Sequence, residues 1–168
     1  TWLQGNTDKH LSQSAGKSFQ GYFLTTDTVG QIVLGSDVTL SGNIWNWNKS
    51  TLKTNGFQLT AQNYRLNNGN IISNEQINLK NTVIDGMKFH GNYKINGKTK
   101  TLSGNVLNGT ATILDTLQNE PFNTSYLTVN GKIINNGTVI KDPATGFALY
   151  MDVFGDIENN GIWRPQQT

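Results

Sequence analysis

The sequence predicts an all-β protein that folds as a parallel β-solenoid, which we interpret as a right-handed β-helix of about six coils. Two observations support this prediction: a short phrase that returns along the chain, and a composition rich in turn residues. The phrase reads apolar–x–apolar–x–Gly–polar–apolar, and its full copies are Val38–Ile44, Leu127–Ile133 and Met151–Ile157. A strand-like phrase that recurs at roughly twenty residues is typical of coils stacked in a solenoid.

The spacing of the phrase sets the expected length of a coil. A shorter copy lies at 101–106, and degenerate copies without the glycine lie at 57–63 and 77–83. Aligned on the second apolar residue, the copies give the series Leu40, Leu59, Leu79, Leu102, Val129 and Val153. The steps of this series are short in the first half of the chain and longer in the second. We therefore expect these residues to hold equivalent places in successive coils.

The composition favours strands and sharp corners over helices. Asn-Gly pairs occur seven times, and such pairs form tight turns because Gly, and to a lesser degree Asn, tolerates positive φ. The chain has three prolines and few runs of helix-forming residues. Its 168 residues fit one domain.

The charge excludes two classes of partner. The formal net charge is +2 and charged residues make up 14% of the chain, which is too little for a nucleic-acid or polybasic membrane partner.

There is no cysteine, so disulfides and thiolate metal sites are excluded. No apolar stretch approaches the length of a transmembrane helix. Because the chain starts at Thr1 and shows no signal-like segment, we expect a processed form or an excised fragment.

Residues 1–30 do not show the repeat. They hold apolar side chains, among them Trp2, Phe19, Tyr22 and Phe23, between Ser, Gln, Gly and Thr. Terminal repeats of solenoids are usually atypical. We expect an irregular N-terminal segment that caps the stack or docks on a neighbour; a ragged first coil is the alternative.

Residues 31–168 are expected to form the solenoid domain, built from short runs with one buried face. The first clear coil, 32–50, contains the apolar runs 32–34, 38–40 and 44–47, separated by corners with Gly. Further coils are expected at 57–74, 77–98, 100–120, 127–150 and 151–163.

The last two coils match each other best. Both place Asn-Asn-Gly at the same corner, at 135–137 and at 159–161. Stacked asparagines at one corner can form a ladder of amide hydrogen bonds. Asn is also simply a favoured turn residue, so both interpretations stay open.

Two insertions interrupt the coils, at 118–125 and 141–146, and both contain proline. Loops that project from a solenoid often mark its binding face, and as often they are neutral insertions.

We expect no enzyme, no metal and no cofactor. His10 and His90 have no metal-binding spacing. The carboxylates lie closest together in the last coil, at Asp152, Asp156 and Glu158. Carbohydrate enzymes with a β-helical fold use acidic clusters of this type. A cross-coil ion pair between Asp156 and Lys132, one coil below, is the simpler interpretation.

Trp45 and Trp47 are next-but-one neighbours, so they share one face of a strand. An exposed pair could stack on sugar rings, whereas a buried pair would belong to the core. These residues are our sequence-based candidates for glycan binding.

The segment from Leu127-Thr-Val-Asn-Gly to Gly161-Ile-Trp163 resembles the Gly/Asn-rich β-solenoid repeats of secreted bacterial surface proteins and adhesins. The resemblance weakens back to residue 32 and does not cover 1–30. It implies an extracellular or cell-surface location and a non-enzymatic role in surface structure or adhesion.

The last coil leads to a functional hypothesis, because an open strand edge with apolar side chains is a template for another chain. We expect copies of the protein to stack head to tail into an extracellular filament. The expected interface consists of Trp2, Phe19, Tyr22, Phe23, Val153, Ile157, Ile162 and Trp163. The alternative is a monomeric adhesive or glycan-binding module of a larger bacterial surface protein, which would use the two loops or the tryptophan pair.

Overall fold

The structure is a computed structural model that contains β-strands and no helix among its described residues. It describes residues 2–5, 7–21, 23–25, 30–42, 44–46 and 50–165, with the backbone alone at 2, 23–24 and 44–46. In this part of the chain, no helix is long and apolar enough to cross a membrane.

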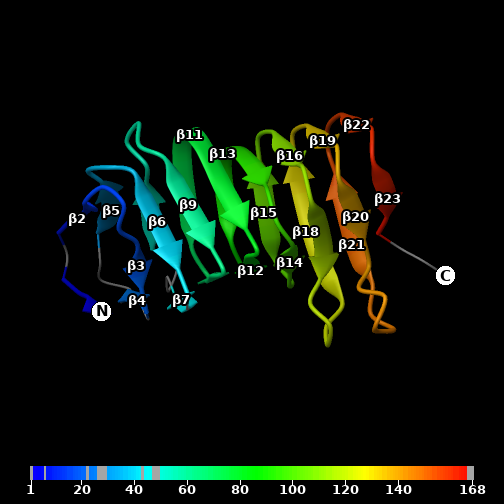
Figure 1. The fold of residues 1–168 in the computed structure, drawn as a ribbon, viewed down its shortest axis with the longest axis horizontal. Helices are drawn as coiled ribbons and strands as arrows, with labels where there is room; N and C mark the ends of the chain where they lie inside the picture. The colour runs from blue at the N-terminus through cyan, green and yellow to red at the C-terminus, as the bar shows by residue number, and fades with distance from the viewer. Residues whose placement is uncertain are drawn as a thin grey trace.

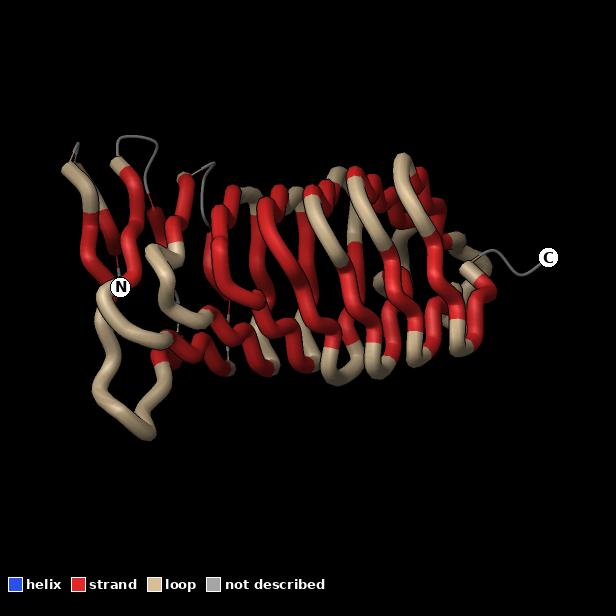
Figure 2. The backbone as a smooth tube through the Cα atoms, turned by 90° about the horizontal axis from the view of Figure 1, so that it is seen from above, coloured by secondary structure: helices blue, strands red, loops and turns tan. Residues whose placement is uncertain are grey.

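Each coil contributes one strand to each of three faces, A, B and C, and the coils stack along the long axis of the molecule (Figures 1 and 2). Face A consists of β1 (Trp2–Leu3), β4 (Phe23–Thr25), β7 (Ile44–Asn46), β10 (Arg65–Asn67), β12 (Val83–Asp85), β14 (Thr99–Thr101), β17 (Thr116–Asn119), β20 (Thr138–Ile140) and β23 (Ile162–Arg164). Face B consists of β2 (Lys9–Leu11), β5 (Gln31–Leu34), β8 (Thr51–Lys53), the first parts of β11 (Asn70–Lys80) and β13 (Lys88–Ile95), β15 (Asn105–Asn108), β18 (Ser125–Asn130) and β21 (Leu149–Val153). Face C consists of β3 (Phe19–Gln20), β6 (Val38–Ser41), β9 (Leu59–Gln62), the second parts of β11 and β13, β16 (Ala111–Ile113), β19 (Ile133–Asn135) and β22 (Ile157–Asn159).

All the described strand pairs are parallel, which confirms the predicted parallel β-solenoid. The length of a coil varies along the stack. In the middle of the stack Arg65 pairs with Val83, whereas near its C-terminal end Ile133 pairs with Ile157, a longer step along the chain. The longer C-terminal coils hold the inserted loops. The handedness of the solenoid stays a prediction.

Strands of the N-terminal segment extend the same ladders. Trp2 pairs with Leu24 on face A, Lys9 pairs with Ile32 on face B, and Phe19 pairs with Leu40 on face C. The described parts of residues 1–30, which we expected to be an irregular cap or docking segment, therefore contribute strands in register with the rest.

The core consists of columns of inward-pointing side chains that run from coil to coil. One column on face C passes from Ile77 to Tyr93, Ala111 and Ile133, all buried. The small Ala111 follows the large Tyr93, so the size of the side chains alternates along the column. The Tyr93 hydroxyl lies 2.6 Å from the Phe89 carbonyl oxygen, and burial raises its pKa. Burial of a large aliphatic side chain stabilises the fold by roughly 1.5–3 kcal/mol.

The recurring phrase marks a corner of the coil and not a fixed place in it. Val38–Ile44 runs from face C to face A, whereas Leu127–Ile133 runs from face B to face C. Accordingly, Val129 pairs with Val153 as aligned, but the aligned residues Leu79 and Val129 lie on different faces, C and B. Leu40 and Leu59 share face C but are two residues out of register, because Leu40 pairs with Ala61. Those parts of the alignment were wrong.

Glycine is required at the B–C corner because successive coils approach closely there. Gly91, Gly109, Gly131 and Gly155 stack in four consecutive coils. A Cβ atom on Gly109 would lie 2.0 Å from the carbonyl oxygen of Gly91, and its φ of +130° also disfavours other residues. This contact explains why the phrase carries glycine in the later coils.

Of the two interpretations of the Asn-Asn-Gly corners, hydrogen bonding between stacked asparagines is observed at the last two C–A corners. The side-chain amide of Asn135 donates to Asn159 Oδ1 at 2.7 Å, and that of Asn160 donates to Asn136 Oδ1 at 3.0 Å. Another asparagine, Asn105, is buried at the A–B corner, where its Oδ1 accepts from the Met87 backbone N–H at 2.9 Å.

Candidate functional site

The C-terminal coil exposes side chains that continue buried core columns. Ile133 is 1% exposed, and its partner in the last coil, Ile157, is 49% exposed. Val153 and Trp163, which follow buried residues of the preceding coil, are partly exposed and pack against the core on one side. These three predicted interface residues therefore lie together at one end of the solenoid.

The fourth predicted residue of this end, Ile162, is also exposed but belongs to a different surface. It pairs with Thr138 and precedes Trp163, so it points outward on face A.

The edges of the last strands also lie at this end of the solenoid. Among the described strands, β21, β22 and β23 each have a partner on one side only.

The structure describes the N-terminal candidates in part. Phe19 is half-buried and packs against the core, in an edge strand of face C. Trp2 and Phe23 are described by their backbone, which pairs with Leu24 and Trp45 respectively. Tyr22 lies outside the described residues.

The tryptophan candidates for glycan binding are not tested by the structure. The Trp45 backbone pairs with Phe23 and Leu66, and its side chain is not described. Trp47 lies outside the described residues.

Both inserted loops stand at the same corner, between faces A and B, and Figure 1 shows them projecting from one edge of the molecule. Hydrogen bonds of Asp142 join the bases of the two loops. Its Oδ2 accepts from Gln118 Nε2 at 2.9 Å, and its backbone N–H donates to Asn119 Oδ1 at 2.6 Å. The loops carry exposed phenylalanines, of which Phe122 is 79% exposed.

An exposed tyrosine pair, which the sequence analysis missed, adjoins these loops. Tyr126 and Tyr150 are paired residues of β18 and β21, and their rings stack with centroids 5.1 Å apart and planes 14° apart. The available signal was their separation along the chain, which equals that of the aligned pair Val129 and Val153. Both tyrosines are at exposed positions of their strands, next to buried residues, so their side chains point outward.

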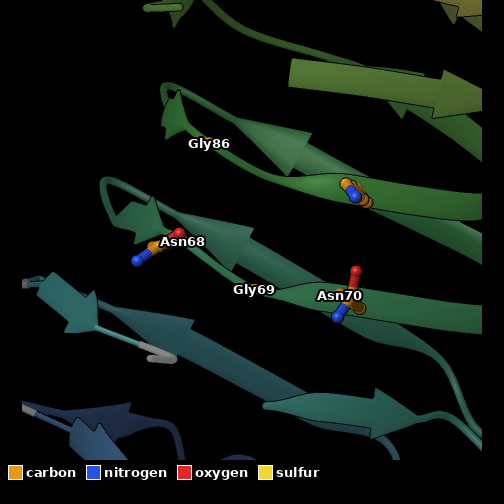
Figure 3. A pocket seen from close by; sticks show the side chains of 5 residues that line it. Asn68, Gly69, Asn70 and Gly86 are labelled. Carbon is orange, nitrogen blue, oxygen red and sulfur yellow. The ribbon is translucent and has the colours of Figure 1, made fainter. Parts of the chain in front are cut away.

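The same corner is hollow in the middle coils. A depression of about 310 Å³ is lined by Asn68, Gly69, Asn70, Gly86 and Lys88 (Figure 3). Lys88 takes part in none of the ion pairs among the described residues. The depression therefore presents amides, backbone and one ammonium group.

The ionic contacts of the last coil differ from the expected ones. Lys132 forms its ion pair with Glu158, at 2.8 Å, and not with Asp156, although the strand register places Asp156 opposite Lys132. The hydrogen bond to Lys132 lowers the pKa of Glu158, and the same bond raises the pKa of Lys132. The charge of Asp156 also raises the pKa of Lys132. Asp152 lies in β21 on face B.

No group of three metal-ligating side chains that could hold an ion occurs among the described residues. His10 and His90 are both exposed on face B, in different coils.

Comparison with protein-family models, curated proteins and solved structures gives no match. The fold and the corner geometry define the chain as a parallel β-solenoid repeat protein. The parallel β-solenoid fold that the resemblance implies is thus confirmed. The biological role of the protein is the subject of a proposal.

Proposed function

We propose that this chain is a structural β-solenoid of a cell surface or extracellular matrix, whose copies stack end to end into a filament. One observation carries the proposal. The core columns that end in Val153, Ile157 and Trp163 are covered on one side only, although their preceding members are buried.

Stacking would bury this end and pair its strand edges. Removing apolar side chains from water contributes about 25 cal/mol per Å² of buried apolar surface. The N-terminal edge strands β1, β2 and β3 have the same three-faced arrangement and an open side among the described strands. A contact between two different ends is heterologous, and such contacts propagate as fibres unless they close into a ring.

The extracellular setting rests on the resemblance of residues 127–163 to repeats of secreted bacterial surface proteins. The absence of cysteine and the low charge are compatible with that setting. In this setting the chain acts through its surface and not through catalysis.

Sedimentation velocity across a concentration series tests the proposal on the chain of 168 residues. We expect the wild-type protein to form growing oligomers, and we expect Ile157→Asp to shift the onset to at least tenfold higher concentration. Leu114→Asp is the matched control, because Leu114 is an exposed aliphatic residue at a lateral corner. Circular dichroism checks that both variants keep their strand content.

A wild-type protein that stays monomeric at every concentration would contradict end-to-end stacking. The same conclusion follows if Leu114→Asp and Ile157→Asp weaken assembly equally, because the contact would then not be at the C-terminal end.

A further inference from the structure

One position at the A–B corner changes from asparagine and glycine to tyrosine along the stack. The strand register places Asn68, Gly86, Gly104, Tyr126 and Tyr150 at this position in successive coils. Close contacts agree with the register. A Cβ atom on Gly86 would lie 3.6 Å from the Asn68 Cα, and one on Gly104 would lie 3.9 Å from the Gly86 Cα.

The change has a conformational cause. Asn68, Gly86 and Gly104 form short corners with φ of +60°, +61° and +75°, a region in which Asn and Gly are favoured. In the next two coils the inserted loops make the turn, and the position becomes part of strands β18 and β21. An extended position accepts an aromatic residue, so Tyr126 and Tyr150 can occur there.

Because Gly86 and Gly104 have no side chains, we infer a trough along this row of positions that ends at the ring of Tyr126. One face of Tyr126 is covered by Tyr150, and its other face points toward the preceding coil. That coil has Gly104 at the matching position, with no side chain to cover the ring, and Tyr126 is 54% exposed. The depression lined by Asn68 and Gly86, shown in Figure 3, lies at the other end of this row.

The dimensions and groups of the trough suit a short carbohydrate. Three coil steps separate Asn68 from Tyr126, about 14 Å at the spacing of neighbouring strands. This length accommodates two or three sugar rings. The open face of Tyr126 can stack on the C–H face of one ring, since aromatic faces carry negative charge density. Asn68 offers both a donor and an acceptor to hydroxyl groups, and Lys88 offers a positive charge.

We propose that the trough from Asn68 to Tyr126 binds a saccharide segment of two or three rings. Lys88 would face a ring hydroxyl or a sugar carboxylate. Binding at this lateral corner is independent of end-to-end stacking, because it uses none of the residues of the C-terminal end.

The test uses immobilised oligosaccharides of two to four units, one panel of neutral hexoses and one containing uronic acids. We expect the wild-type chain to bind members of at least one panel. Binding to uronic acids that is lost in Lys88→Met would identify the acidic class, and binding to hexoses would identify the neutral class.

Two variants test the position of the site. Gly104→Asn fills the trough beside Tyr126, and the corner tolerates it because Asn68 has the same conformation one coil step beyond Gly86. We expect Gly104→Asn and Tyr126→Ala each to weaken binding at least tenfold while strand content is kept. Phe154→Ala removes an exposed aromatic ring outside the trough and should bind as the wild type does.

Absence of wild-type binding to both panels would overturn the proposal, as would full binding by the folded Gly104→Asn variant. Ile157→Asp should bind saccharides normally. Its behaviour separates the two proposals, because it tests stacking without changing the trough.

Discussion

Single residues explain why the phrase repeats. At the B–C corner the backbone of each coil comes so close to the next that a Cβ atom on Gly109 would overlap the Gly91 carbonyl oxygen. The glycine is therefore selected by the distance between coils as well as by its turn conformation. Asn135 and Asn136 add amide hydrogen bonds along the same direction at another corner.

Gly109→Ala should destabilise the protein by roughly 3 kcal/mol, because overpacking and a strained φ each cost about 1–3 kcal/mol. Chemical denaturation measures the loss. Gly146→Ala is the control, since no heavy atom lies within 4 Å of its added Cβ and its φ is not positive. Equal stability of Gly109→Ala and wild type would show that the coils are not this close.

The Lys132–Glu158 pair gives a pH-dependent prediction. The folded state lowers the pKa of Glu158 from 4.5, so its contribution is present above that value and is lost as pH falls through the lowered pKa. The pKa of Lys132 is raised from 10.5, so the contribution is also lost at the alkaline end, as pH rises through the raised pKa.

We therefore expect Glu158→Gln to lower the melting temperature slightly at neutral pH, and we expect the difference from wild type to vanish in acid. The effect is small because the pair is exposed. Thermal melts between pH 2 and pH 7 measure it. A difference that grows as pH falls would contradict the assigned pair.

At the scale of elements, the two inserted loops depend on one buried carboxylate. Asp142 accepts from Gln118 and from the Ala144 N–H at 2.9 Å, and its own N–H donates to Asn119. We therefore expect the hydrogen bonds of Asp142 to fix the bases of the two loops that carry the exposed phenylalanines.

Asp142→Ala should cost about 1–3 kcal/mol, because it leaves the buried side-chain amide of Gln118 without its acceptor. Hydrogen exchange should rise at residues 118–125 and 141–148 more than elsewhere. Asp115→Ala is the control, since Asp115 is exposed and its carboxylate bonds the adjacent Thr116. Unchanged exchange in both loops would mean that Asp142 does not hold them.

The strand elements were more predictable than the contacts of their side chains. Alternation and corner glycines predict strands such as β6 and β18, because each strand has one buried face. The register was harder for two reasons. The same phrase serves different corners, and the degenerate copy at 57–63 was placed two residues out of register, so that Leu40 was aligned with Leu59 although its true partner is Ala61. The Tyr126–Tyr150 stack requires the register to be known first, so the phrase alone could not reveal it.

At the scale of the whole molecule, the stack is quasi-one-dimensional: each coil contacts its neighbours and ends differ from the middle. Stability should therefore fall toward the ends. We expect backbone amides of β21, β22 and β23 to exchange faster in the monomer than those of β11 and β13, and to become protected on assembly. Uniform exchange along the stack would contradict this description.

The central claim is that copies stack along the solenoid axis, and electron cryomicroscopy of the concentrated protein tests it most directly. Faces B and C hold eight described strands each and face A holds nine, so each copy should add about 38–43 Å to a filament at about 4.8 Å per strand. Unbranched filaments with that axial repeat and continuous strand ladders are the expected result. Isolated particles at every concentration, or assemblies joined through lateral faces, would contradict the claim.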